Sequence, residues 1–183
     1  MPPTATRILT YGVDVSPAQL RRLSPIGVSG SRNFRNLSLV AEWVKAIGPC
    51  ALIVGDAAGV DTVVSSVAEQ RGGYTVVVVP FRSAAGKAGG LLRNPDVARY
   101  AGEFVCFWSG LPSKSDPDST SDMGSTGAAH AAMWALVYGK PLVVYLADGS
   151  HVQTGEPIRA TGFVSPRHLM PRPLAGQPVS PQS

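Results

Sequence analysis

Two apolar runs between Val28 and Asp61 each end in a glycine-containing loop that leads into a helical pattern. The loops read Gly30-Ser31-Arg32 and Gly55-Asp56-Ala57-Ala58-Gly59-Val60-Asp61. An open α/β sheet builds phosphate sites from such loops, because backbone N–H groups and helix N-termini attract anions. The pattern therefore favours an α/β fold whose ligand site is made by the residues that follow each strand.

Three further strand signals continue this plan along the chain. The predicted strands cover 26–29, 50–54, 75–79, 103–108 and 141–147, and the predicted helices cover 36–47, 60–70, 95–100 and 126–138. Such alternation implies right-handed crossovers and a parallel sheet. We therefore predict a Rossmann-like, doubly wound sheet of about five parallel strands with helices on both faces.

The length of 183 residues suits one well-buried domain. We expect residues 26–147 to form a Rossmann-like nucleotide-binding domain and residues 1–25 to form an N-terminal extension packed on it. In that extension, a short strand near Arg7 and a helical turn from Pro17 to Leu23 are expected. Residues 148–183 are predicted to form a Pro-rich C-terminal extension that is disordered from about 165, because little there can be buried.

The balance of charge narrows the classes of partner. The net charge of +4 and the pI near 9.3 favour an anionic ligand, without the clustered Lys/Arg stripe of a duplex-DNA binder. Cys50 and Cys106 lie in or beside apolar runs and form no C-x-x-C pair, which indicates a reduced, cytoplasmic protein. Neither a metal nor a cofactor is expected, and the apolar runs are too short for a membrane span.

The loops after the first and second strands hold the first group of candidate ligand-binding residues. Glycine permits a tight turn, and the planar fork of Arg32 suits phosphate. Asp61 can accept from a ligand hydroxyl or simply cap the next helix, and Gly30 with Arg32 can be a turn glycine and a surface arginine. The candidates here are Gly30, Ser31, Arg32, Gly55, Gly59 and Asp61.

The loops after the third and fourth strands hold the second group. Lys87 and Arg93 can face an anion, Asn94 can cap the next helix, and this segment can also be a flexible surface loop. Ser125, Thr126 and Gly127 open an Ala-rich helix and can cradle an anion or only cap that helix. Because all four loops follow parallel strands, they should converge on one edge of the sheet.

The polar segment from Ser109 to Ser125 is unusually long for a connection inside a domain. Loops of this length are often lids or binding loops. We expect this segment to be mobile without ligand and to close when a ligand binds.

Taken in order, five motifs carry a family resemblance that no single motif carries. They are Gly30-Ser31-Arg32-Asn33-Phe34, Gly55-x-Ala-x-Gly59-x-Asp61, the block from Gly86-Lys87 to Arg93-Asn94, Phe107-Trp108, and the Ser/Thr/Gly stretch before the helix that ends in Gly139-Lys140-Pro141. Over roughly residues 26–145 the chain resembles the YspA-related (YpsA-like) branch of the SLOG superfamily, which also contains DprA-like and lysine-decarboxylase-like LOG proteins. The resemblance implies a Rossmann-like fold that binds or senses a nucleotide or a nucleotide-derived small molecule.

The chain departs from the family pattern in three places. Asp56 stands where a second glycine is usual, and Ser125-Thr126-Gly127 replaces a Ser-x-Gly-Thr order. The Pro-Gly-Gly-x-Gly-Thr-x-x-Glu motif of the LOG phosphoribohydrolases has no match. Without that glutamate, hydrolysis would depend on Asp61, Asp56 or His130 as acid or base.

The sequence thus supports three functional hypotheses. The leading one is the binding or sensing of a nucleotide-derived small molecule at the carboxyl edge of the sheet. The alternatives are phosphoribohydrolase-like hydrolysis of a nucleotide derivative and DprA-like binding of single-stranded nucleic acid, although aromatic residues interleaved for base stacking are missing. A homodimer or higher homo-oligomer is also expected.

Overall fold

The computed structural model describes residues 7–109 and 124–154, without the side chains of Lys87, Ser125 and Thr126. All strands in this part of the chain belong to one seven-stranded sheet with the order β1-β4-β3-β2-β5-β6-β7. The elements are β1 Arg7–Thr10, α1 Pro17–Leu23, β2 Ile26–Gly30, α2 Leu37–Ile47, β3 Ala51–Val54, α3 Val60–Arg71, β4 Thr75–Val78, the 3₁₀ helix η1 Ser83–Ala88, α4 Gly89–Tyr100, β5 Glu103–Phe107, α5 Gly124–Val137, β6 Leu142–Tyr145 and β7 His151–Thr154.

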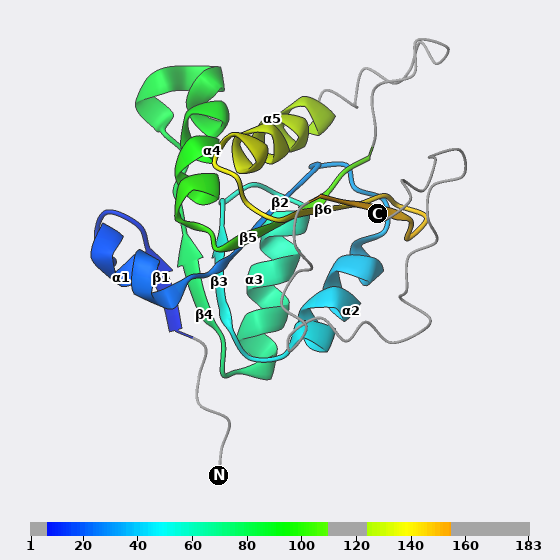
Figure 1. Ribbon diagram of the computed structural model, residues 1–183, viewed down its shortest axis with the longest axis horizontal. Helices are drawn as coiled ribbons and strands as arrows, with labels where there is room; N and C mark the ends of the chain where they lie inside the picture. Colours follow the sequence, from blue (N-terminus) through cyan, green and yellow to red (C-terminus); the bar gives the residue numbers. More distant parts are fainter. Residues whose placement is uncertain (1–6, 110–123, 155–183) are drawn as a thin grey trace, which may run out of the picture.

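The predicted fold class is confirmed. The neighbouring strands from β1 to β6 all pair in parallel, and only β6 and β7 pair antiparallel. The helices lie on both sides of the strands (Figure 1). The five central strands follow the order β4-β3-β2-β5-β6, so the chain leaves β2 first toward one edge of the sheet and then returns to the other side of β2.

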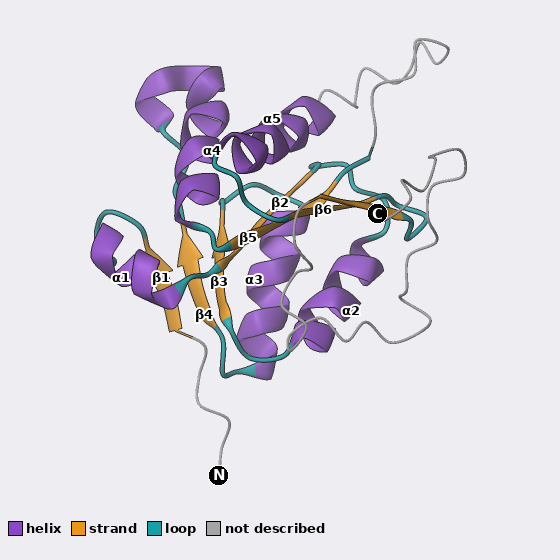
Figure 2. Cartoon of the chain, viewed as in Figure 1, coloured by secondary structure: helices purple, strands orange, loops and turns teal. Residues whose placement is uncertain are grey.

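Each face of the sheet buries its own apolar cluster, because successive side chains of a strand point to opposite faces. Helices α2 and α3 pack together on one face, and α4 and α5 pack together on the other (Figure 2). In β5, for example, Val105 and Phe107 belong to the first cluster, whereas Phe104 and Cys106 belong to the second. This two-sided burial explains why the central strands read as continuous apolar runs.

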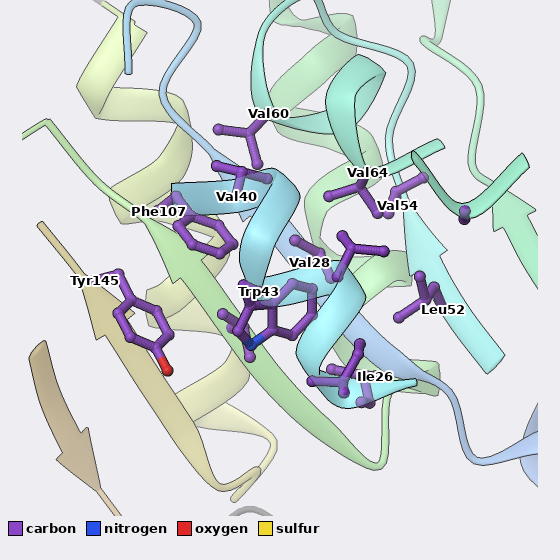
Figure 3. Packing of buried hydrophobic residues seen from close by; sticks show 14 of the residues in the cluster. Ile26, Val28, Val40, Trp43, Leu52, Val54, Val60, Val64, Phe107 and Tyr145 are labelled. Carbon is purple, nitrogen blue, oxygen red and sulfur yellow. The ribbon is translucent and has the colours of Figure 1, made fainter. Parts of the chain in front are cut away.

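Helix α2 shows how the sequence positions an element on the sheet. Asn36 caps it, with its Oδ1 accepting from the Leu39 N–H at 3.0 Å. Trp43 packs its ring edge against Phe107, with 5.6 Å between ring centroids, and lies among the aliphatic side chains of β2 and β3 (Figure 3). Helix α2 is therefore packed against strands β2, β3 and β5.

The predicted start of the helix before β5 is wrong. Helix α4 begins at Gly89, so that Asn94 and Pro95 lie inside it, and Asn94 does not act as its cap. Proline within a helix removes one backbone hydrogen bond and is costly. The helix nevertheless continues through Pro95, and Arg93, Asn94, Val97 and Ala98 on it are buried.

The sheet also has more strands than the predicted five. The short strand expected near Arg7 is confirmed as β1, and it extends the sheet as a parallel partner of β4. Strand β7 was not predicted. It follows a turn in which Asp148 Oδ1 accepts from the Ser150 N–H at 2.8 Å and Gly149 has φ +85°. An Asp-Gly pair between apolar segments is a hairpin signal, and it marks this turn in the sequence.

Two predicted features fall outside the described residues. Most of the expected closing loop from Ser109 to Ser125 lies in residues 110–123, and the expected disordered tail lies in residues 155–183. Within the described ranges, every helix is too short or too polar to cross a membrane.

Candidate functional site

The order in which the chain adds strands to the sheet reverses at β2, which lies between β3 and β5. This position is the topological switch point of the sheet. Loops that leave such a switch point diverge and open a crevice at the carboxyl ends of the strands. Gly30, Ser31 and Arg32 end or follow β2, and Gly55 follows β3 on the same edge of the sheet. The structure thus brings the first two predicted loops together at the switch point.

Direct backbone contact joins these two loops. A Cβ atom at Gly59 would lie 2.7 Å from the carbonyl oxygen of Arg32, and Gly59 has φ +88°. Only glycine accommodates both this close approach and this left-handed conformation. Gly59 is also the N-cap residue of α3, which has no side-chain cap. The alternative that Asp61 caps this helix is therefore wrong.

Arg93 forms the centre of a charge cluster behind the loops. Its side chain is 8% exposed and reaches from α4 to two carboxylates on the β3–α3 segment. One guanidinium nitrogen pairs with Asp56, and Nη2 lies 3.5 Å from Asp61 Oδ2. The guanidinium predicted to face an anion is thus already neutralised by two aspartates.

Asp61 is the buried carboxylate of this cluster. Its Oδ2 accepts from the Ala57 N–H at 3.2 Å, while Oδ1 has no hydrogen-bond partner. Burial raises the pKa of Asp61 to about 6, and the nearby guanidinium of Arg93 opposes that rise only in part. Asp61 therefore becomes protonated within a mildly acidic range.

Gly55 makes this cluster possible. A Cβ atom at Gly55 would lie 2.6 Å from Asp61 Oδ2 and closer still to the guanidinium carbon of Arg93. The absence of a side chain lets the ion pair pass directly over the end of β3. Gly55 thus has a packing role in the structure, and its predicted contact with a ligand stays a prediction.

A pocket of about 230 Å³ opens at this edge of the sheet, and it is lined by Arg32, Asp56, Ala57, Ala58, Phe81 and Arg93. Arg32 is exposed, and no carboxylate among the described residues pairs with its guanidinium. The volume is below the roughly 300–1,000 Å³ of typical small-molecule sites. The pocket can therefore enclose only part of a larger ligand.

A larger hollow of about 470 Å³ lies at the turn between β1 and α1 and is lined by Tyr11, Gly12, Val13, Asp14, Val15, Ser16, Pro17 and Gln19. Its single charged side chain is that of Asp14. Because it offers no cation and lies away from the switch point, it is a poorer candidate for an anionic ligand than the smaller pocket.

Ser31 turns inward rather than toward the crevice. The side chain is fully buried, and its Oγ accepts from the Ser109 N–H at 3.1 Å. The Ser31 N–H donates to the Phe107 carbonyl at 2.9 Å. Ser31 therefore joins the loop after β2 to the end of β5.

Asn94 and His130 join α4 to α5. Asn94 Nδ2 donates to the Gly127 carbonyl at 3.0 Å and lies 3.3 Å from His130 Nδ1. Trp134 Nε1 donates to His130 Nε2 at 3.2 Å. His130 thus lies at the contact between α4 and α5, with its Nε2 occupied by the Trp134 indole.

The structure does not place every predicted residue. The side chains of Lys87, Ser125 and Thr126 lie outside the described part, and Gly127 lies in the first turns of α5 beneath Asn94. Sequence reasoning missed Phe81, which is one of the residues that line the pocket and whose ring packs against Gly89. The available signal was its place two residues after Val79, at the carboxyl edge where ligands are expected.

Comparisons with known proteins support the fold. No protein-family model and no curated protein matches the chain. A crystal structure of DNA processing protein A (DprA) from Streptococcus pneumoniae is similar, with a TM-score of 0.51 and 17% sequence identity over 76% of this chain. The match covers 53% of the DprA chain, so this protein spans about half its length. At this identity the similarity shows a shared Rossmann-like fold alone.

Proposed function

We propose that the pocket at the end of β3 binds a nucleotide or a nucleotide-derived small molecule. The observation that carries this proposal is the exposed guanidinium of Arg32, which no described carboxylate neutralises, beside the uncapped N-terminus of α3. The first amides of a helix have no intrahelical partner and attract anions. Arg32 would bind a phosphate oxygen, and the ring of Phe81 would face the sugar or the base.

The charges around the pocket limit what this site can hold. The arginines at 32 and 93 balance the aspartates at 56 and 61 when all four are ionised. Of the two arginines that line the pocket, Arg32 is the one whose guanidinium has no carboxylate partner among the described residues. The pocket therefore offers one unpaired guanidinium to a phosphate group of the ligand.

Calorimetry with AMP, ADP and ATP tests the proposal. A nucleotide present at about 100 times its dissociation constant should also stabilise the fold by roughly 2.7 kcal/mol. The absence of heat and of thermal stabilisation with all three nucleotides would reject nucleotide binding.

The shared fold with DprA favours a second candidate, single-stranded nucleic-acid binding. Such binding depends on several phosphate contacts and weakens steeply with salt. Titration of a fluorescent oligothymidylate at 50 and 200 mM salt distinguishes the two candidates. Strong binding with a steep salt dependence, together with no response to mononucleotides, would favour nucleic acid.

The buried carboxylate of Asp61 favours a third candidate, hydrolysis of a nucleotide derivative. Its raised pKa suits a proton donor, but the pocket-lining residues include Asp56 and not Asp61. Asp61 would therefore act only after the Arg93 cluster rearranges. Chromatography of nucleotides incubated with the protein would detect released base or phosphate if hydrolysis occurs.

We also propose that the protein forms a homo-oligomer, as its sequence leads us to expect. Helices α4 and α5 expose several apolar side chains, which are Leu91, Leu92, Met133, Leu136 and Val137. The α5 sequence contains no Asp, Glu, Lys or Arg, so two copies would meet there without like-charge repulsion. Sedimentation equilibrium should show a dimer that Leu136→Glu dissociates. Leu37→Glu, on α2 across the sheet, should leave the dimer intact.

A further inference from the structure

We propose that Asp56 makes the pocket selective for ribonucleotides over 2′-deoxyribonucleotides, by accepting hydrogen bonds from ribose hydroxyls. This inference rests on the proposed nucleotide binding and adds the identity of the sugar. Asp56 follows β3 by two residues, and β3 is the neighbour of β2 at the switch point. In doubly wound sheets, an acidic residue near this point is well placed to bind a ribose hydroxyl.

The two carboxylates on Arg93 differ in their access to a ligand. The Asp56 side chain is 38% exposed and lines the pocket, whereas the Asp61 side chain is 6% exposed and does not. Asp56 is thus the acidic group in this cluster that a bound molecule can contact. An ionised carboxylate only accepts hydrogen bonds, so it repels phosphate and requires a donor on the ligand.

The protein holds Asp56 in one orientation. One oxygen pairs with Arg93, and Oδ2 accepts from the Phe81 N–H at 2.9 Å. Each carboxylate oxygen can accept more than one hydrogen bond, so both retain capacity for a ligand. A carboxylate oriented by two donors loses little further freedom when it accepts two neighbouring hydroxyls.

The neighbours of Asp56 complete a site for the nucleoside part of a nucleotide. Phe81 lines the same pocket as Asp56 and Arg32. Arg32 can take the phosphate, Asp56 the sugar hydroxyls and Phe81 the face of the sugar or base. This division of roles uses one cation, one acceptor and one aromatic surface within a pocket of about 230 Å³.

The donors could instead come from a base, since the Watson–Crick edge of guanine also carries neighbouring N–H groups. The experiment therefore compares ADP, 2′-deoxy-ADP, GDP and 2′-deoxy-GDP by calorimetry on the full chain. We expect ADP to bind about 10-fold to 100-fold more tightly than 2′-deoxy-ADP, with the same preference in the guanine pair. This range corresponds to a hydrogen bond with a charged partner.

Asp56→Asn should bring ADP and 2′-deoxy-ADP within about twofold of each other. Asp96→Asn is the matched control, because Asp96 also pairs with an arginine, Arg82, but does not line the pocket. It should keep the wild-type preference. The wild-type comparison needs no variant, so it decides the matter even if Asp56→Asn does not fold.

Equal binding of ADP and 2′-deoxy-ADP by the wild type would overturn this inference and leave nucleotide binding intact. An Asp56→Asn effect on the choice between GDP and ADP, with no effect on the choice of sugar, would also overturn it. If none of the four nucleotides binds, the proposed function fails and the inference fails with it.

Discussion

The guanidinium of Arg93 on α4 meets the carboxylate of Asp61 on α3 directly over the end of β3, with 3.5 Å between Nη2 and Oδ2. These helices lie on opposite faces of the sheet, and Gly55 leaves the space through which their side chains meet. A buried ion pair that loses one partner leaves an uncompensated charge, which is strongly destabilising. The ion pair therefore connects a helix from each face of the sheet, α3 and α4, next to the candidate site.

Gly55→Ala tests this packing. The added methyl group would overlap the ion pair, and overpacking of this kind costs about 1–3 kcal/mol. We expect the free energy of unfolding in urea to fall by that amount. Gly127→Ala is the control, because a Cβ there would contact nothing within 4 Å. That variant should be neutral or gain up to about 1 kcal/mol through helix propensity. Equal stability of Gly55→Ala and the wild type would contradict the packing account.

The pH dependence of stability tests the environment of Asp61. Its folded-state pKa of about 6 lies above the ordinary value of 3.8, so the folded protein binds the proton more tightly than the unfolded chain. The resulting stabilisation is fully present below about pH 4 and is lost as the pH rises through about 6. Each unit of pKa difference corresponds to about 1.36 kcal/mol, so the loss is at most about 3 kcal/mol.

Asp61→Asn isolates this contribution, because the other titrating groups remain. The charged groups that act on Asp61 are Arg93, Asp56 and Arg32. We expect the stability of the wild type, relative to Asp61→Asn, to be greater at pH 4.5 than at pH 7.5. Urea unfolding of both proteins at the two pH values gives this difference. A constant difference, or one of opposite sign, would show that burial does not raise the pKa of Asp61.

Ser31→Ala tests the link between β2 and β5. The variant would leave the partly buried Ser109 N–H without the Ser31 hydroxyl, and a hydrogen bond of this kind contributes about 0.5–1.5 kcal/mol. We expect Ser31→Ala to have a lower melting temperature. At temperatures where the variant is folded, its ADP affinity should change little, because the Ser31 hydroxyl faces the protein. Ser38→Ala, at an exposed position on α2, should change stability by less than about 0.5 kcal/mol. A large loss of ADP affinity in folded Ser31→Ala would show that Ser31 acts on the ligand directly.

The parallel sheet could be predicted because its central strands are buried on both faces. Val76 and Val77 of β4, for example, belong to opposite apolar clusters, so the sequence there is uninterrupted by polar residues. The start of α4 could not be predicted in this way. Local signals placed the start at Asn94 and Pro95, but the helix begins at Gly89, and the preceding residues Gly89 and Arg93 are buried by contacts with distant parts of the chain.

Local sequence patterns predicted where the candidate loops lie on the sheet, but they did not predict which charged side chains form ion pairs. That Gly30, Arg32 and Gly55 share one edge follows from strand order alone. The ion pairs of Arg93 with Asp56 and Asp61 depend on how α4 crosses β3, which no local pattern encodes. From the sequence, Arg93 was expected to face an anion, but of the two arginines that line the pocket, Arg32 is the one that no described carboxylate pairs with.

The affinity of Arg32→Ala for ADP tests the central proposal most directly. A charge-assisted hydrogen bond contributes about 1.5–3 kcal/mol, so its loss should weaken binding about 10-fold to 150-fold. The melting temperature without ligand should stay unchanged, because no described carboxylate pairs with Arg32. Arg35→Ala, three residues along at another exposed position, should bind ADP like the wild type. Unchanged ADP affinity in Arg32→Ala, or an equal loss in Arg35→Ala, would contradict the assignment of the phosphate to Arg32.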